Sequence, residues 1–297
     1  MPRSYVLKKY EELFFAKQIS IDEYLENIRS TEIKNYRVKT IKSGEMLEVE
    51  IYPVYKKSQS TKIASFEPSR VAQQNLNYEN RKKYITRLVN TNFNNAHMWA
   101  TFDYSHIHMP TSPLEAQKNI QNYFRRLKRH IKKNKLEELK YIYVTEWVEN
   151  EKTGKIHAHH HIIMNFADRD KAEELWEKGH RLQTRRLQSD DYGLEGLARY
   201  IAKEETKNKD KKGVKSYVPS KNLEKPKMAI SDHKISKRKA SQIAENENTA
   251  KEIFENLYKD YKFNDIKVKY SDYVAGAFIY TRMKQSHTNK VSKKRRN

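Results

Sequence analysis

Four histidines crowd one short segment of the chain and are its clearest sign of chemistry. Residues 157–161 read His-Ala-His-His-His and run directly into Ile-Ile-Met. Such a segment is typical of a β-strand, in which alternate side chains share a face. His157, His159 and His161 are therefore expected on one face, and His160 on the other. Alpha-carbons two residues apart in a strand are about 6.5–7 Å from each other, a distance that one metal ion can bridge.

A carboxylate is expected beside these imidazoles. Residues 141–147 form another β-rich segment, and the turn-like residues 150–154 join it to the histidines. The two segments are expected to pair as a hairpin, which brings Glu146 next to the histidine strand. Hard divalent ions take oxygen ligands as well as nitrogen, so this combination predicts a metal site. The simpler interpretation is a histidine-rich edge of the surface that binds nothing.

A tyrosine about forty residues further on is the second candidate. Residues 193–205 read as a helix whose apolar positions form one stripe, with Tyr200 at its border and Lys203 on the exposed flank. Such a tyrosine could attack a phosphodiester and keep the energy of the broken bond in a covalent phosphotyrosine. Lys203 could stabilise the phenolate or the developing phosphate charge. The simpler interpretation is a tyrosine at the edge of the core, because a chain with 20 tyrosines and many lysines contains this spacing by chance.

The elements that must position these residues alternate between strands and helices. Strands are predicted at 98–103, 141–147, 156–164 and 181–187, and helices at about 69–91, 112–131, 169–178 and 193–205. The sequence Ser-Pro-Leu-Glu at 112–115 is a strong helix start. In the helix at 69–91, Val71, Tyr84 and Leu88 are expected to face inward. Helices between strands around an antiparallel hairpin indicate an α+β fold with a central antiparallel sheet.

The flanking segments carry fewer signals. A helix is predicted over 5–28, a hairpin over 36–52 around Ser43-Gly44-Glu45, a linker over 56–68, and an amphipathic segment followed by a strand within 250–284. The run from Lys207 to Lys215 and the helix face at 125–133 are cationic and could contact phosphates. The last residues, 286–297, contain five Lys and Arg residues and no acid, which predicts a mobile tail.

Composition limits the classes of partner and of site. The 297 residues carry a formal net charge of +22, which indicates a polyanionic partner, with nucleic acid as the first expectation. The absence of cysteine excludes disulfides, thiolate nucleophiles and cysteine-based metal sites. No stretch approaches about 18 consecutive apolar residues, and the start has no signal-peptide pattern. We therefore expect a soluble, cytoplasmic protein that does not associate with a membrane.

The histidine strand and the tyrosine helix together resemble the HUH endonuclease superfamily, in particular the single-tyrosine rolling-circle replication initiators (Rep) of plasmids, phages and integrative elements. The family motif has two histidines flanking one residue that is usually hydrophobic. His157 and His159 flank Ala158, whereas His159 and His161 flank His160 but are followed by Ile-Ile-Met, as in many initiators. We prefer His159 and His161 as the ligands, with His157 as a third ligand or a substitute.

The resemblance extends over about residues 70–284. Within this range it is specific at the two main motifs and looser elsewhere. Further similar segments are 87–93, 99–103, 168–170, Leu175-Trp176 with Gly179, and 222–226. The expected domains are an N-terminal helical and hairpin extension at 1–66, an HUH endonuclease domain with a C-terminal elaboration at 67–284, and a basic disordered tail at 285–297. Residues 1–66 resemble no family.

The resemblance implies nicking and joining of single-stranded origin DNA. It implies a palm-like antiparallel sheet with the histidine strand in the middle and helices on the far face. Mg²⁺ or Mn²⁺ would be held by the histidines and Glu146. Tyr200 would attack phosphorus, leaving a 5′-phosphotyrosine and a free 3′-hydroxyl that primes synthesis by host helicase and polymerase. His160 would be structural, and Tyr192 is the nearest rival nucleophile.

Two other functions fit the same residues. One is an origin- or RNA-binding regulator without catalysis, whose histidines bind a structural metal or nothing. The other is a relaxase or a tyrosine transposase of the same superfamily. The origin sequence, the metal, the oligomeric state and the type of genetic element do not follow from the residues.

Overall fold

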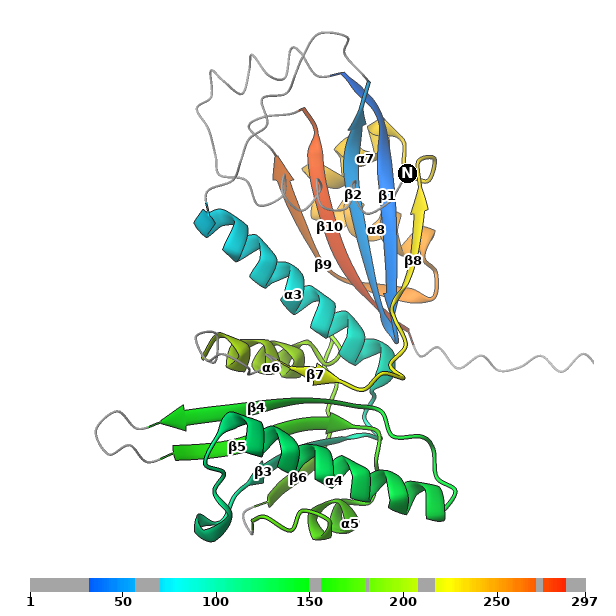
Figure 1. Cartoon of the computed structure of the whole chain (residues 1–297). Helices are drawn as coiled ribbons and strands as arrows, with labels where there is room; N and C mark the ends of the chain where they lie inside the picture. Colours follow the sequence, from blue (N-terminus) through cyan, green and yellow to red (C-terminus); the bar gives the residue numbers. More distant parts are fainter. Residues whose placement is uncertain are drawn as a thin grey trace, which may run out of the picture. The chain divides into compact units, whose positions relative to one another are not determined.

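The computed structural model describes residues 32–56, 70–149, 156–179, 182–207, 217–270 and 275–286, with the backbone alone described at 70–76, 148–149 and 203–207 (Figure 1). The predicted helix at 5–28, nearly all of the linker, most of the run from Lys207 to Lys215 and the tail beyond 286 lie outside these ranges. Within them the fold is α+β, as predicted, but it contains two five-stranded antiparallel sheets where the sequence indicated one central sheet.

Contacts divide the chain into two units. One unit comprises residues 1–80 and 226–297, and the other comprises residues 81–225. Helix α3 (Arg70–Asn92) contains the division. The domain boundary predicted at 66–67 lies outside the described residues, and the one at 284–285 lies at the end of strand β10 (Ala277–Gln285), so both boundaries stay predictions.

The sheet of the unit 81–225 contains the histidine strand at its centre. Its strand order is β6-β3-β5-β4-β7. The bounds are β3 Met98–Asp103, β4 Tyr141–Glu149, β5 Ile156–Met164, β6 Leu182–Arg186 and β7 Val218–Pro219. The histidines of β5 therefore have a strand on each side, as the resemblance implied. Because β3 and β4 both pair antiparallel with β5, each supplies side chains directly opposite the histidines.

Helices cover both faces of this sheet. Helices α4 (Pro113–Lys133) and α5 (Arg169–Glu174) contribute to a core with Ile162 and Met164 of β5. Helices α3 and α6 (Glu195–Lys207) contribute to a second core with Ile163. The resemblance implied helices on the far face. The histidine face also holds α3 and α6, because β5 ends in an apolar run that needs burial on both sides.

The start of α4 and the inward face of α3 can be compared with prediction. Ser112 caps α4 by accepting a hydrogen bond from the Glu115 amide, as the sequence indicated. In α3, Leu88 is buried as predicted, but Tyr84 is 43% exposed, so that prediction was wrong. The buried stripe runs through Ile85, Leu88 and Val89, which turns Tyr84 away. The side chain of Val71 lies outside the described part.

The second unit is a sheet with two helices on one face. Its strand order is β8-β1-β2-β10-β9, and helices α7 and α8 pack through a shared apolar core (Figure 1). The bounds are β1 Ile33–Ser43, β2 Met46–Tyr55, β8 Lys227–Ser231, α7 Lys237–Glu245, α8 Glu247–Leu257, β9 Tyr261–Tyr270 and β10 Ala277–Gln285. The predicted hairpin is present, and Gly44 takes the positive φ that its tight turn requires. In the described ranges, no helix is both long and apolar enough to cross a membrane.

Candidate metal centre and neighbouring tyrosine

The histidine face of the central sheet collects side chains from three adjacent strands. Strand register places His159 between Asp103 of β3 and Glu146 of β4, and places His161 between Thr101 of β3 and Val144 of β4. Side chains directly opposite each other in an antiparallel sheet share a face. Two carboxylates therefore flank one histidine, because three strands happen to be in this register.

Glu146, His159 and His161 form one compact group. Oε2 of Glu146 lies 2.8 Å from Nε2 of His159 and 3.7 Å from Nε2 of His161. The two Nε2 atoms are 3.0 Å apart. All three residues are largely withdrawn from solvent. One carboxylate oxygen and two imidazole nitrogens thus converge on a single small volume, where a metal ion could be held.

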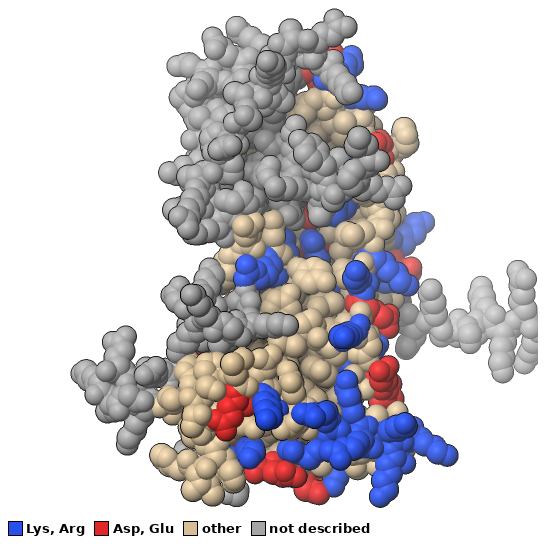
Figure 2. Space-filling view, viewed as in Figure 1, with Lys and Arg blue, Asp and Glu red and all other residues tan. Residues whose placement is uncertain are grey.

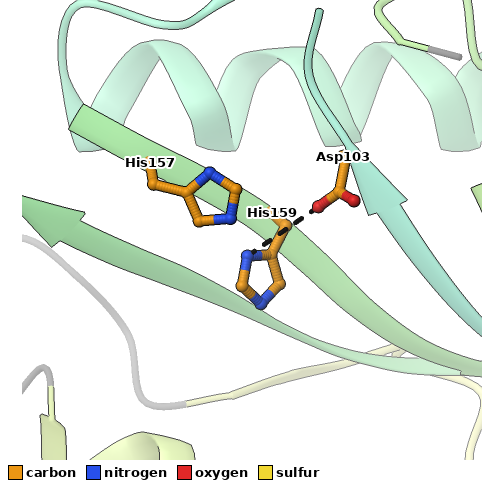
Figure 3. Close-up of side chains that lie close together, drawn as sticks. All are labelled: Asp103, His157 and His159. Carbon is orange, nitrogen blue, oxygen red and sulfur yellow. Dashed lines mark ion pairs between the residues drawn. The ribbon is translucent and has the colours of Figure 1, made fainter. Parts of the chain in front are cut away.

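A second group shares His159. Asp103, His157 and His159 also offer ligand atoms within 4.8 Å of one another (Figure 3). Oδ1 of Asp103 lies 3.9 Å from Nδ1 of His159, and that nitrogen is buried without a hydrogen-bond partner. His157 is the most exposed of the three. His159 is therefore the residue common to both groups, with one ring nitrogen directed at each carboxylate.

His161 is held from two sides. Oγ1 of Thr101 lies 3.1 Å from Nδ1 of His161. A proton on Nδ1 would be donated to this hydroxyl, which leaves the lone pair of Nε2 free for a metal. The indole of Trp99 stacks on the imidazole, with centroids 5.2 Å apart and planes 16° apart. Trp99 is buried, so the ring of His161 is fixed in orientation.

Helix α6 brings the hydroxyl of Tyr200 to this group. Its oxygen lies 3.3 Å from Nε2 of His161, the same nitrogen that faces Glu146 and His159. The phenol ring meets the rings of His161 and Trp99 edge-on, at 5.1 and 5.7 Å between centroids. Tyr200 is nevertheless 42% exposed. A side chain held on one side and open on the other can be reached by a polymer that approaches from solvent.

The apolar stripe of α6 explains this placement. Leu194, Ala198 and Ile201 are buried in the core that α6 shares with β4 and β5, as the sequence predicted. Tyr200 borders this stripe and therefore stands at the rim of the helix–sheet contact. Lys203 lies one turn further along α6, and its side chain is outside the described residues. Tyr192, the rival tyrosine, precedes the helix.

His160 faces the other side of the sheet, as predicted, and is fully buried there. Nε2 lies 2.8 Å from the hydroxyl of Tyr104, and Nδ1 lies 2.9 Å from Oγ1 of Thr145. Burial, together with the smaller effect of the neighbouring His159 and His161, lowers the pKa of His160 to about 3. A neutral imidazole with both nitrogens partnered is a structural residue that fixes the middle of β5.

The donor set fits a divalent cation. Two carboxylates lie on the histidine face, and the imidazoles next to them can be neutral ligands. The unpartnered Nδ1 of His159 is a buried polar atom that a hydrogen bond or a cation would satisfy. Glu146, His159 and His161 would hold the ion, with Asp103 and His157 on the other side of His159. The donor atoms do not select among metals.

Sequence reasoning missed three contributors on β3. Trp99 stacks on His161, Thr101 contacts its Nδ1, and Asp103 faces His159. The strand itself was predicted, but its pairing with β5 was not. Strand alternation alone places these three residues on one face, so the missing signal was the identity of the neighbouring strand.

Comparison with known proteins covers the same elements. Residues 97–209 match the family model described as replication-associated protein ORF2/G2P. This segment begins before β3 and ends after α6. It therefore contains the five potential metal ligands and Tyr200. No curated protein and no solved structure gives a significant match to the chain.

Proposed function

We propose that this chain, which over residues 97–209 belongs to the replication-associated ORF2/G2P family of rolling-circle Rep proteins, nicks and rejoins single-stranded DNA at a replication origin. Tyr200 is the proposed nucleophile, and Glu146, His159 and His161 are the proposed metal ligands. The reaction class is transesterification at phosphorus, in which the protein holds one DNA end covalently.

One observation carries the proposal. The hydroxyl of Tyr200 lies 3.3 Å from Nε2 of His161, on the side chain that contacts both other members of the group. The histidines and the tyrosine are separated by about forty residues and come from a strand and a helix. Their meeting at one point supports a shared reaction, since core packing alone would not require the phenol oxygen to face the imidazole nitrogens.

The proposed step exchanges one phosphorus–oxygen bond for another. A bond forms between the oxygen of Tyr200 and the phosphorus, while the bond from phosphorus to the 3′ oxygen of the preceding nucleotide breaks. The phenol loses its proton, and the departing oxygen gains one to become a 3′-hydroxyl. Attack of a 3′-hydroxyl on the phosphotyrosine reverses the step and rejoins the strand without an external energy source.

The residues around the proposed phosphate position have different roles. Mg²⁺ or Mn²⁺, when bound, supplies polarisation of a phosphate oxygen. Thr101 and Trp99 fix His161, so that the ring cannot rotate during the reaction. Trp99 also meets the ring of Tyr200, which limits the positions of the phenol. We propose that Lys203 stabilises the phenolate from the next turn of α6.

The exposed tyrosines of this unit support a single-stranded substrate. Tyr200 and Tyr84 are its large exposed aromatic side chains in the described ranges, and both lie on helices that pack on the histidine face. Unpaired bases stack on such rings, whereas bases within a duplex are already stacked. The free 3′-hydroxyl would serve host helicase and polymerase as a start for synthesis.

The test uses the full chain with labelled single-stranded DNA from the region flanking its gene, in Mn²⁺ or Mg²⁺. We expect a product that stays protein-linked on a denaturing gel. Tyr200→Phe should abolish the linked product and retain DNA binding, because only the hydroxyl is removed. Tyr192→Phe is the matched control and should nick like the unchanged chain.

Two results would contradict the proposal. Linked product from Tyr200→Phe at the unchanged rate would exclude this residue as the nucleophile. DNA binding by the unchanged chain without any cleavage, across both metals and a range of DNA segments, would favour the non-catalytic regulator. Binding can be followed by fluorescence anisotropy in the same samples.

A further inference from the structure

Helix α4 carries a line of cations on the face opposite its buried stripe. The buried stripe includes Ile120, Leu127 and Ile131, which pack on the sheet. At 100° per residue, the exposed line lies about 180° from it. Lys118, Arg125, Arg129 and Lys133 lie within about 40° of this line, Lys132 lies within about 60°, and Lys128 lies further round the helix. Figure 2 shows Lys and Arg gathered over this part of the unit.

These cations are not neutralised by acidic neighbours. In the part of the chain that the structure describes, no carboxylate lies within 4.0 Å of any of the six. Arg126, on the flank of the buried stripe, is the exception on this helix, because it contacts Glu177 and the carbonyl oxygen of Leu175. Glu115 at the helix start is engaged by the amide and hydroxyl of Thr111. Glu115 also interacts electrostatically with Lys118, so the line presents its uncompensated charge mainly from Arg125 onward.

The line is long enough to contact several phosphates of a nucleic-acid backbone. From Lys118 to Lys132 the helix rises about 21 Å, at about 1.5 Å per residue. Duplex DNA carries one negative charge per about 1.7 Å of its axis, so the line faces several phosphates at once. Displacement of the counterions condensed on those phosphates would favour binding.

The positions of the exposed aromatic side chains indicate which face suits a single strand and which suits a duplex. Within the described part of this unit, the large exposed aromatic side chains are Tyr84 and Tyr200, on helices of the opposite face. The ring of Tyr141 near α4 is stacked on Phe124 at 3.8 Å and lies under the ammonium group of Lys128. The α4 face thus offers charge without free rings for base stacking, which suits a backbone whose bases are paired.

We infer that the exposed face of α4 binds the phosphate backbone of duplex DNA, on the side of the sheet opposite Tyr200. This inference rests on the proposed function, since it divides one DNA molecule between two faces of the unit. Single-stranded DNA would reach the histidine face, while a flanking duplex would be held by α4. Binding by charge alone is independent of base sequence.

The experiment compares two variants with the same change in charge. The first replaces four exposed cations of α4 by glutamine: Lys118, Arg125, Arg129 and Lys132. The control replaces four exposed cations of α7 and α8 by glutamine: Lys237, Arg238, Lys239 and Lys251. Glutamine keeps helix propensity, so both should fold, which circular dichroism and thermal melting check. Anisotropy of a labelled duplex of arbitrary sequence is measured from roughly 50 to 200 mM salt.

We expect the α4 variant alone to lose duplex binding. Each lost phosphate contact reduces the slope of log Kobs against log salt by about 1, so four should reduce it by about 3 to 4. Over roughly a fourfold range of salt, the affinity of the unchanged chain should fall about 100-fold more than that of the variant. Nicking and binding of a single-stranded oligonucleotide should stay unchanged.

The opposite results overturn the inference. Equal losses in the two variants would mean that net charge, and not this face, drives binding. An equal loss of single-stranded and duplex binding would mean that the face does not prefer a duplex. Unchanged duplex affinity with lost binding to anionic phospholipid vesicles would assign the face to a membrane. Failure of the unchanged chain to nick would instead contradict the proposed function and leave the duplex measurement intact.

Discussion

Single alanine replacements of the three same-face histidines should weaken metal binding unequally. His159 belongs to both groups of potential ligands, whereas His161 and His157 each belong to one. His161 is the more buried of these two and lies with its Nε2 atom 3.0 Å from that of His159. His157 is exposed, so it must give up contact with water to bind an ion. We predict the largest effect at His159, then His161, then His157.

The size of each effect follows from the geometry. Removal of a partner that only orients a ligand typically costs about 10- to 100-fold in metal affinity. Loss of His159 or His161 removes a ligand atom itself and should therefore cost more than about 100-fold, or about 2.7 kcal/mol. His157→Ala leaves the group of Glu146, His159 and His161 intact, and should cost less than about tenfold.

The assay is calorimetric titration of the full chain with Mn²⁺ at neutral pH, checked by circular dichroism for folding. His233→Ala, which changes an exposed histidine of the other unit, is the control and should bind like the unchanged chain. A large loss in His157→Ala together with normal binding in His161→Ala would refute the reasoning. The ion would then be held by the group that contains Asp103.

Three further perturbations have defined outcomes. His160 has a pKa of about 3 when folded and 6.5 when unfolded, so the unfolded chain takes up the proton first and stability falls as pH drops below 6.5. In EDTA the loss by pH 5 should reach about 2 kcal/mol in urea unfolding, and His160→Gln should remove this contribution. Gly179→Ala would place Cβ against the last carbonyl oxygen of β3 and should lower the free energy of unfolding by about 1–3 kcal/mol. Gly196→Ala, with open space around it, is the control and should not lower the free energy of unfolding in the same measurement. Trp99→Phe should misplace Tyr200 and so slow single-turnover nicking by up to about 100-fold, while the affinity for Mn²⁺ changes little. Equal losses of nicking rate and Mn²⁺ affinity would contradict the role of Trp99 in positioning Tyr200.

Local patterns predicted the parts of the site that a single element determines. Alternation along β5 gave the faces of the four histidines, because strand geometry has a fixed period of two. The apolar stripe of α6 placed Tyr200 at its border for the same kind of reason. The hairpin of β4 and β5 placed Glu146 beside His159, since a short connection fixes which strands pair.

These local patterns could not predict which strands pair when they lie far apart in the sequence. Strand β3 pairs with β5 across more than fifty residues, and this contact alone brings Asp103 to His159. The second sheet is a stronger case, because β2 near residue 50 pairs with β10 near residue 280. The sequence shows that each strand has an apolar face, but many partners can cover such a face. Register across distant segments depends on the whole chain.

The position of the covalent bond tests the central claim most directly. After reaction with single-stranded DNA and Mn²⁺, the protein-linked product is digested with nuclease and protease, and the modified peptide is sequenced by mass spectrometry. The proposal predicts a nucleotide phosphate on the oxygen of Tyr200. A phosphate on another residue, or cleaved DNA with no protein attached, would contradict it.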